Sequence, residues 1–490
     1  MTVSPRLRFP PPVRAAASRH AILFAAVATV VCLALAVVNG ALLIATVATV
    51  ILFTLALRDL STGVLAVLAS VPLQAAASLN LHGADVTWTK LAVGATLLAW
   101  TVRIVTGYSR PRLDAVAAAM GVYVLVLSIS IVEAQNVSAW AGEVYRWAVA
   151  LALYVAWVES LRGVRAVRGI ALVTAVAVLA VAAYAAWQVA TGAGPATFSA
   201  GGLTRVYATF GEPNPFAGYL EMTTLLLVAL VLGNATAARR RAAVQSLGRV
   251  VPVAVVVASL AGMGALLATQ SRGGYLGFAV GLGTIVWLTG GKVRWLGTVA
   301  AGICLAVALL SPLGGSVTER FRSVSLTTSS EQVTTDNFAE QERAAHWGAA
   351  VHMAESSPIL GVGAGNFDER YREATTVWRF RIPRGHAHNA YLQALAQAGI
   401  VGAVSYLCLL AAVAWKIWKS LQRVQDPLFR SVVVGIAAVT VAVAVHNTVE
   451  YLHVLSLGIQ LSVVWAMLEV DAEIFSIRPT AKSGLAVISA

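Results

Sequence analysis

The sequence predicts an all-α polytopic membrane protein, and three observations indicate it. The chain has 490 residues, of which 58% are hydrophobic and only 12% are charged. Its mean hydropathy of +0.77 is far more apolar than a single water-soluble core requires. Apolar runs recur along most of the chain at about 20 residues, the length with which a helix crosses roughly 30 Å of hydrocarbon. We expect about fourteen membrane-spanning helices, within a range of 12–14.

The charges and cysteines exclude other classes. A net charge of +13 would suggest nucleic acid as the partner of a soluble protein. In a membrane protein the position of the charges matters more than their sum, so no nucleic-acid partner is expected. Cys32, Cys304 and Cys408 lie far apart inside apolar runs, which argues against a disulfide framework or a thiolate metal site.

In chain order, residues 1–19 are predicted to be a basic cytoplasmic tail before an uncleaved first span. Residues 20–311 hold eleven predicted spans, residues 400–470 hold three, and residues 471–490 form a second cytoplasmic tail. The spans are 20–38, 41–57, 62–79, 87–105, 113–132, 143–160, 166–190, 213–233, 249–269, 273–290, 293–311, 400–418, 430–448 and 452–470.

The distribution of basic residues predicts the orientation of the chain. If the N-terminus is cytoplasmic, Lys and Arg should gather in alternate loops. Most of the Lys and Arg residues do fall in the predicted inner loops, as this orientation requires. The short outer loops and the adjoining span ends hold only Lys90, Arg146, Arg205 and Arg272.

Residues 312–399 form the one long polar segment, which we expect on the outer side of the membrane with its own helices. Residues 340–355 predict an amphipathic helix with Ala344, Trp347, Val351 and Ala354 on its apolar face. A second short helix should carry Phe367, Tyr371 and Ala374. Residues 387–398 predict an interface helix, because Gly399 and Gly402 break an apolar stretch too long for one span.

Two arginines on the predicted outer face suit an anionic ligand. Arg205 precedes Pro213 and Pro215, which predict a helix start with free backbone N–H groups. Arg272 sits in a turn between two spans, where an unpaired guanidinium within the bilayer would cost at least ~2.5 kcal/mol. Arginine binds two phosphate oxygens at once, so the pair indicates a diphosphate. The alternative for each is an arginine that snorkels to lipid headgroups.

His388 is the candidate general base. A histidine at a helix N-terminus is favoured in its neutral, proton-accepting form. Asn389 or Tyr391 would orient the ring, and His386 is the competing candidate. The alternative is a polar residue at the membrane rim.

Glu450, with His446 and His453 about one helical turn away on either side, is expected to share one face at the outer end of a span. The three would line the same cavity as His388 or form a separate structural cluster. A zinc site from His386, His388 and His446 is a weak possibility, because the spacing lacks a carboxylate or thiol. No metal and no cofactor are expected.

Several motifs together resemble the O-antigen ligase and O-antigen polymerase superfamily of bacterial membrane glycosyltransferases. They lie within roughly residues 200–410. They are Arg205 with Phe210-Gly-Glu-Pro-Asn-Pro-Phe216, Ser271-Arg-Gly-Gly274, Arg343-Ala-Ala-His-Trp347, Ser357-Pro-Ile-Leu-Gly-Val-Gly-Ala-Gly-Asn-Phe367, His388-Asn-Ala-Tyr-Leu-Gln393 and Ala398-Gly-Ile-Val-Gly402.

The resemblance implies a GT-C-like, metal-independent enzyme in the cytoplasmic (inner) membrane of a bacterium, with its active site on the outer, periplasmic side. It would transfer a glycan from a polyprenyl (undecaprenyl) diphosphate to an acceptor hydroxyl with inversion. Arg205 and Arg272 would hold the diphosphate, His388 would be the base, and Arg343 would give support. The extra N-terminal spans and the second histidine, His386, depart from the family pattern.

Ligases, polymerases and protein oligosaccharyltransferases share these motifs, so the acceptor is a lipid core, a growing polysaccharide or a protein. A lipid-linked glycan flippase or secondary transporter is the alternative from another class. Such a protein should have paired halves with ionisable groups near the middle of the bilayer. The polar residues of this chain gather instead at one predicted face and in one long segment.

Overall fold

The computed structural model describes residues 40–469 except 75–77, 82–83, 196–197, 201–202, 240–249, 292–293, 296–337 and 376. The predicted tails, the span 20–38 and nearly all of the span 293–311 lie outside this part. Within it, six helices are long and apolar enough to cross a membrane. They are Ala115–Glu133, Gly163–Thr191, Pro213–Gly233, Val251–Ala268, Ala390–Arg423 and Pro427–His446. With further, shorter apolar helices, they make the chain an all-α, multi-pass membrane protein.

Four of the helices described in the first half begin at a residue whose side chain caps them. They are α2 (Gly40–Arg58), α3 (Leu60–Ser70) with η1 (Val71–Leu73), α4 (Trp88–Val105), α5 (Ala115–Ile129) with η2 (Ser130–Glu133), α6 (Val137–Ser160) and α7 (Gly163–Thr191). The side chains of Asp59, Thr87, Asp114 and Asn136 accept hydrogen bonds from the first-turn backbone N–H groups of α3, α4, α5 and α6. Each satisfies a donor that has no partner within its helix.

The predicted span 62–79 is shorter than expected. Helix α3 and its 3-10 extension end at Leu73, and Gln74 donates a hydrogen bond to the carbonyl of Leu455. The chain then forms an antiparallel hairpin of β1 (Ser78–Leu81) and β2 (Ala84–Thr87). A hydropathy pattern does not distinguish a short helix followed by a strand from one longer helix.

The second half holds β3 (Ser199–Ala200), β4 (Leu203–Thr204), α8 (Pro213–Arg239), α9 (Val250–Ala268), α10 (Arg272–Thr289), α15 (Ala390–Arg423), α16 (Pro427–His446), α17 (Leu457–Ala466) and η6 (Met467–Glu469). Helices α8, α10 and α16 pack closely together. A Cβ on Gly281 of α10 would touch the side chains of Leu225 on α8 and Ala442 on α16, so the α10 backbone packs directly against its neighbours.

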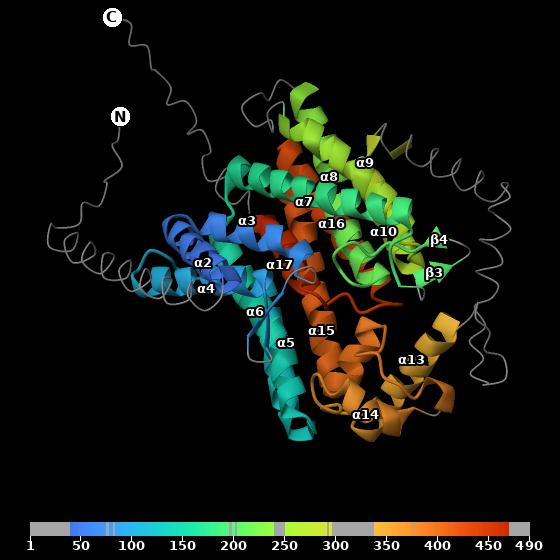
Figure 1. Cartoon of the computed structure of the whole chain (residues 1–490). Coiled ribbons are helices and arrows are strands. Elements are labelled where there is room, and N and C mark those ends of the chain that lie inside the picture. Colours follow the sequence, from blue (N-terminus) through green and yellow to red (C-terminus); the bar gives the residue numbers. More distant parts are fainter. Residues whose placement is uncertain are drawn as a thin grey trace, which may run out of the picture.

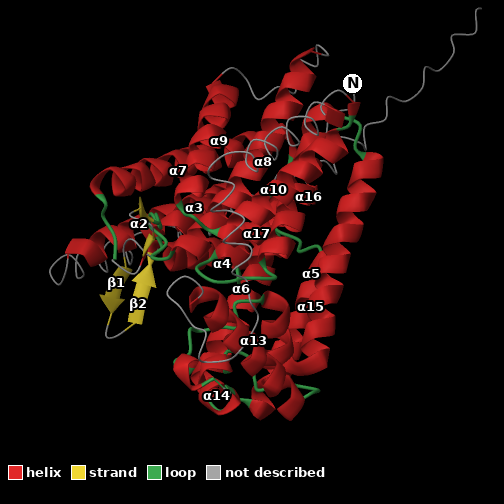
Figure 2. Cartoon of the chain, turned by 90° about the vertical axis from the view of Figure 1, so that its right-hand side faces the viewer, coloured by secondary structure: helices red, strands yellow, loops and turns green. Residues whose placement is uncertain are grey.

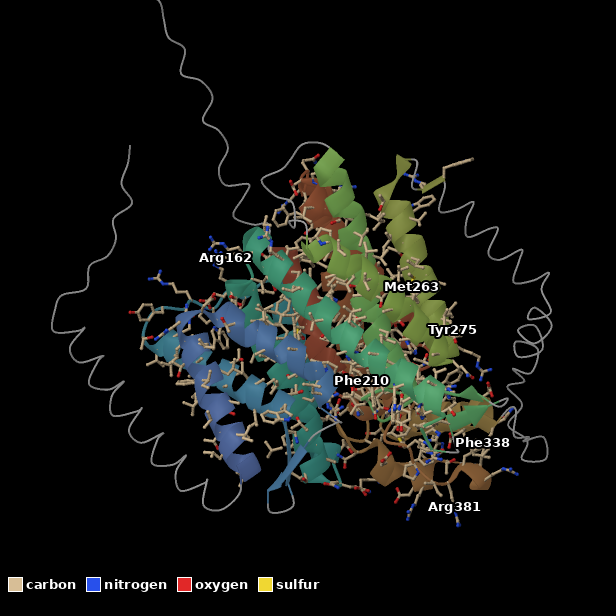
Figure 3. The ribbon with its side chains drawn as sticks, turned by 45° about the horizontal axis from the view of Figure 1, so that its top comes forward. Arg162, Phe210, Met263, Tyr275, Phe338 and Arg381 are labelled. Atoms are coloured by element: carbon tan, nitrogen blue, oxygen red, sulfur yellow. The ribbon has the colours of Figure 1, made fainter. Side chains whose placement is uncertain are left out.

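The polar segment has a small core of its own. It contains α13 (Phe338–Ser356), α14 (Phe367–Ala374) and η5 (Trp378–Phe380). Its core residues are Ala349, Ala350, Met353, Val362, Phe367, Tyr371, Ala374, Ala387 and Ala396. The predicted apolar face of the first helix is therefore rotated, and Val351 is exposed. Figures 1 and 2 show α13 and α14 together at one end of the helix bundle. In Figure 3, Arg162 lies toward the opposite end from Phe338 and Arg381.

The predicted break in the apolar stretch 387–418 is present. Helix α15 leaves helical geometry at Ala398 and at Gly399, whose φ is +62°. The freed carbonyls are satisfied by the glycine turn after α13. Val362 and Gly363 donate to the carbonyls of Ala396 (2.9 Å) and Gln397 (3.1 Å). These hydrogen bonds hold the polar segment against α15 at the point where this helix breaks.

Candidate functional site

His388 lies immediately before α15, in a strained turn. Its φ is +50°, which is uncommon for a residue other than glycine. The Asn389 side chain caps α15 by accepting from the N–H groups of Tyr391 and Leu392. The indole N–H of Trp347 donates to the His388 carbonyl at 3.4 Å. The turn is therefore fixed from both α15 and α13, and its strain is of the kind that accompanies functional sites.

Glu450 is the centre of the site. Its side chain is 5% exposed, and its Oε1 lies 2.9 Å from Nδ1 of His388. Its Oε2 accepts from Nδ2 of Asn214 at 2.7 Å and lies 3.6 Å from a guanidinium nitrogen of Arg343. Residues from three distant parts of the chain thus meet at one carboxylate.

The surrounding groups keep Glu450 ionised. Burial alone would raise the pKa of this carboxyl, but the hydrogen bond from His388 and the charges of His388, His386 and Arg343 hold the pKa well below its usual value. An ionised carboxylate accepts hydrogen bonds only. It therefore favours the histidine tautomer with the proton on Nδ1, which leaves Nε2 of His388 as a proton acceptor. Asn389 donates to the Thr448 carbonyl and Tyr391 to the Ala444 carbonyl, so Glu450 holds the ring in place of the predicted pair.

Arg205 is linked to the same carboxylate through Asn214. Its Nη2 donates to Oδ1 of Asn214 at 3.0 Å, and its Nε donates to the Thr269 carbonyl at 3.0 Å. Burial lowers the pKa of Arg205, and the positive charges of Arg343 and Arg272 lower it further. The guanidinium groups of Arg343 and Arg272 therefore lie close enough to that of Arg205 to act on its charge.

Arg272 is the first residue of α10, after the capping residue Ser271. Its guanidinium forms an ion pair with Glu340 of α13. Gly273 and Gly274, which follow Arg272, leave no open space for a lipid headgroup, because a Cβ on Gly273 would touch His446 and one on Gly274 would touch Ala217. These glycines instead allow α10 to pack closely on its neighbours.

His386 stands beside His388 with its ring centroid 4.4 Å away. Its Nδ1 accepts a hydrogen bond from the His388 backbone N–H at 3.2 Å, so this nitrogen is already used. Burial, aided by His388, His346 and Arg146, lowers the pKa of His386 to about 4. His386, His388 and Glu450 place their ligand atoms within 4.8 Å of one another and would be the residues to hold a metal. The positive charges of Arg205, Arg272 and Arg343 nearby disfavour a metal cation at this site.

His346 belongs to the site although the sequence did not single it out. It is completely buried on α13, and its ring centroid lies 5.4 Å from that of His388. Burial lowers the pKa of His346 to about 4, and the nearby His388 contributes to the shift. The signal was its place in Arg343-Ala-Ala-His-Trp347. Asn214 and Glu340 were also not singled out from the sequence. Their importance arises only from contacts between distant parts of the chain, because Asn214 donates to Glu450 and Glu340 pairs with Arg272.

The expected shared face of His446, Glu450 and His453 is wrong. Helix α16 ends at His446, so Glu450 lies in a non-helical connection. Nδ1 of His446 lies 2.9 Å from Glu221 of α8, and Nε2 of His453 lies 2.9 Å from the Tyr406 hydroxyl. Only Glu450 faces His388, and His446 is therefore not available for the zinc site considered with His386.

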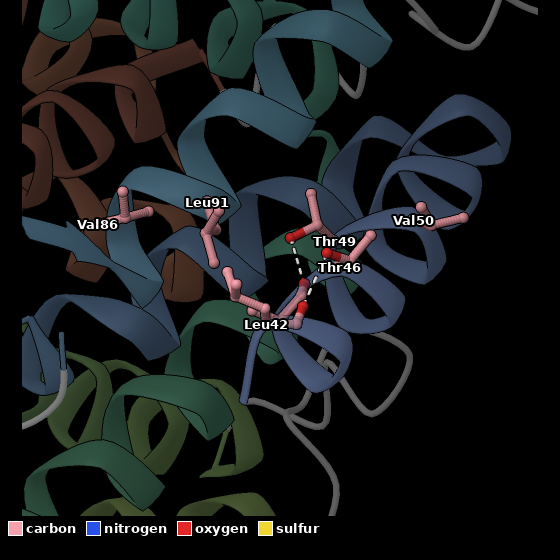
Figure 4. Close-up of a pocket in the computed structure, with 7 residues that line it drawn as sticks. Leu42, Thr46, Thr49, Val50, Val86 and Leu91 are labelled. Carbon is pink, nitrogen blue, oxygen red and sulfur yellow. Dashed lines mark hydrogen bonds between the residues drawn. The ribbon is translucent and has the colours of Figure 1, made fainter. Parts of the chain in front are cut away.

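A cavity elsewhere in the structure does not compete with this site. It has a volume of about 200 Å³ and lies between α2 and the start of α4, lined by Leu42, Ala45, Thr46, Thr49, Val50, Val86 and Leu91. Both threonine hydroxyls donate to carbonyls of their own helix (Figure 4). The lining thus presents an apolar surface to any ligand.

Fold and site together define the class: a multi-pass membrane protein with a buried histidine–carboxylate pair among arginines, beside a polar segment. Residues 254–407 match the family model described as O-antigen ligase. This confirms the resemblance to the O-antigen ligase and polymerase superfamily and indicates a membrane glycosyltransferase of that general type. The matched segment contains Arg272, Arg343 and His388, whereas Arg205 and Glu450 lie outside it. None of the curated proteins matches the chain.

Proposed function

We propose that this protein transfers a glycan from a polyprenyl diphosphate, such as undecaprenyl diphosphate, to an acceptor hydroxyl at the outer face of a bacterial cytoplasmic membrane, as an O-antigen ligase does. The observation that carries the proposal is the hydrogen-bonded array from Arg205 through Asn214 and Glu450 to His388, with Arg272 and Arg343 beside it. This array brings the proposed base, His388, and the proposed anion-binding residue, Arg205, together in one site.

His388 is the proposed general base. Glu450 accepts a hydrogen bond from the N–H at Nδ1, so Nε2 takes the proton of the acceptor hydroxyl as its oxygen attacks the anomeric carbon. The bond from that carbon to the diphosphate oxygen breaks, and polyprenyl diphosphate leaves with the electron pair. One direct displacement inverts the anomeric configuration. Glu450 stabilises the imidazolium that forms, as the carboxylate of a catalytic triad does.

The arginines are proposed to bind the diphosphate and to stabilise the negative charge that develops on it. Nε of Arg343 is buried and has no hydrogen-bond partner among the described residues, so it has a donor to offer. The diphosphate would replace the Glu340 carboxylate at Arg272. In this mechanism the guanidinium groups supply the positive charge, and neither a metal nor a cofactor takes part.

The proposal includes the orientation of the chain, a GT-C-like fold and the residues 312–399 as a periplasmic segment. It holds equally for a ligase, for a polysaccharide polymerase and for a protein oligosaccharyltransferase, because these enzymes differ only in the molecule that carries the acceptor hydroxyl. A gene deletion distinguishes them by whether surface glycans lose their lipid anchor, become shorter or disappear from a protein.

The substitution His388→Ala tests the base. We expect transfer from a polyprenyl-diphosphate-linked glycan in proteoliposomes to fall by at least about 100-fold, the usual contribution of a general base. His352→Ala is the matched control, because this histidine lies on α13 with a side chain that is 58% exposed. Full activity of the His388 variant would show that the base is another group.

A transporter of lipid-linked glycan is the second candidate, and one observation favours it. Glu221 and His446 form an ionisable pair inside the helix bundle, and transporters often contain ionisable residues in such positions. Proteoliposomes measured with and without acceptor distinguish the two functions. Movement of the donor glycan across the bilayer without acceptor, together with no transfer when acceptor is present, would establish the transporter.

A further inference from the structure

A second glutamate–histidine pair lies deeper in the bundle than the first. Oε2 of Glu221 on α8 lies 2.9 Å from Nδ1 of His446 at the end of α16. The two residues are 0% and 1% exposed, and Oε1 of Glu221 has no hydrogen-bond partner among the described residues. Burying such groups within a membrane bundle is costly, so a pair retained there usually serves the function of the protein.

Helix α10 rests on this pair through two glycines. A Cβ on Gly273 would lie 2.6 Å from Cδ2 and 2.8 Å from Nε2 of His446. A Cβ on Gly277 would lie 2.8 Å from Oε2 of Glu221. These separations are below any normal contact, so the backbone of the first two turns of α10 is seated on the imidazole and the carboxylate.

The contact with Gly273 fixes the neighbouring residue, Arg272. The hydrogen bond to Glu221 prevents the His446 ring from turning aside, so the ring is a rigid support. On the other side, Ser271 holds the same turn by accepting from the Gly274 N–H at 3.3 Å. The start of α10 therefore has one position relative to α8 and α16.

We propose that Glu221 and His446 are positioning residues that set the place of Arg272 in the anion site. The inference rests on the proposed function, in which Arg272 binds the donor diphosphate. Glu221 supports the arginine through His446 and the α10 backbone, just as Glu450 supports the base. The pair Glu221–His446 then positions the arginine that binds the leaving group, and Glu450 positions the histidine that removes the proton.

The experiment is a mutant cycle on Gly273, with steady-state transfer measured against donor and acceptor separately. Gly273→Ala places a methyl group against the His446 ring, and we expect the KM for the polyprenyl-diphosphate-linked glycan to rise about tenfold or more while the KM for acceptor stays unchanged. Gly283→Ala is the matched control, since a Cβ at this exposed position of α10 meets nothing within 4 Å.

The cycle is repeated where the support is absent. Glu221→Gln with His446→Ala removes the ring without leaving a buried carboxylate unpaired. A Cβ on Gly273 would also lie 2.9 Å from Cγ2 of Val449, so this background carries Val449→Ala as well. The methyl group then has room, and Gly273→Ala should change the donor KM by less than about twofold. An equal effect in both backgrounds would overturn the positioning role.

A third background, Arg272→Ala, separates this inference from the proposed function. If Arg272 binds donor and the pair acts through it, Gly273→Ala should add nothing to the effect of Arg272→Ala on donor KM. If Arg272→Ala raises the donor KM but Gly273→Ala raises it further by the same factor as in wild type, the positioning role is wrong and the diphosphate role stands. A normal donor KM for Arg272→Ala would refute the diphosphate role itself, and the positioning role with it.

Discussion

At the scale of single residues, the site depends on one carboxylate whose importance is not visible in its sequence neighbourhood. Glu450 contacts His388, Asn214 and Arg343, and none of these lies within sixty residues of it. The carboxylate contacts His388 through one oxygen and Arg343 through the other. Its two oxygens therefore set the relative position of the proposed base and the proposed anion site.

Glu450→Gln tests the orienting role. The amide has nearly the same shape but can donate to Nδ1 of His388, which would favour the tautomer with its proton on Nε2 and remove the base. We expect kcat for transfer to fall by about 100-fold or more, and the thermal unfolding midpoint to fall as well, because Arg343 loses its charged partner. Glu373→Gln, at a carboxylate that is 68% exposed, is the control. Unchanged kcat would mean that Glu450 only serves the structure.

At the scale of elements, the break in α15 couples the polar segment to the membrane helices. Gly399 has a positive φ, and a Cβ there would overlap the backbone of Ile359. The same junction brings α13 next to the turn of His388. The position of the base thus depends on a contact between two backbones that only glycine permits.

Gly399→Ala should therefore lower both stability and transfer. We expect a reduced unfolding midpoint and a large loss of kcat, because the turn after α13 has to move away from α15. Gly348→Ala is the control on α13, where a Cβ meets nothing within 4 Å. Wild-type values for Gly399→Ala in thermal unfolding and turnover would exclude this coupling.

Two buried histidines, His346 on α13 and His386 beside His388, predict how the stability of the folded protein depends on pH. The pKa values of His346 and His386 are lowered to about 4 in the folded protein, from about 6.5 when unfolded. Between these values the unfolded chain binds more protons, so stability is complete above about pH 6.5 and falls as the pH falls toward 4. Glu450, with its depressed pKa, adds a further loss only below about pH 4.5.

The measurement is the unfolding midpoint between pH 7.5 and pH 4.5. His346→Gln keeps an N–H donor for the Glu342 carbonyl but does not titrate, so its midpoint should depend less on pH than that of wild type. His352→Gln, at an exposed position, should retain the wild-type dependence. Identical slopes for wild type and His346→Gln would show that His346 does not carry this effect.

At the scale of the whole molecule, long-range contacts converge on one end of the bundle. The Asn136 backbone N–H donates to Oδ1 of the buried Asn366, and Nδ2 of Asn366 donates to the Asn136 carbonyl. The Ala364 N–H donates to the Ser130 hydroxyl at 2.9 Å. The polar segment is thus anchored to the start of α6 as well as to α15. This anchoring places α13 so that Glu340 reaches Arg272, Arg343 reaches Glu450 and Trp347 reaches the His388 carbonyl.

The sequence by itself determined the class of fold and the break at Gly399, because hydropathy and helix-breaking residues act locally. It also predicted Arg205, Arg272 and His388 as site residues, from charge in apolar surroundings and from position in the chain. Tertiary structure alone decided which residues support them. His446 was expected beside Glu450, yet it pairs with Glu221 because α16 ends at that residue and α8 lies against it. Partner choice depends on distances between helices far apart in the chain, and no local pattern encodes those distances.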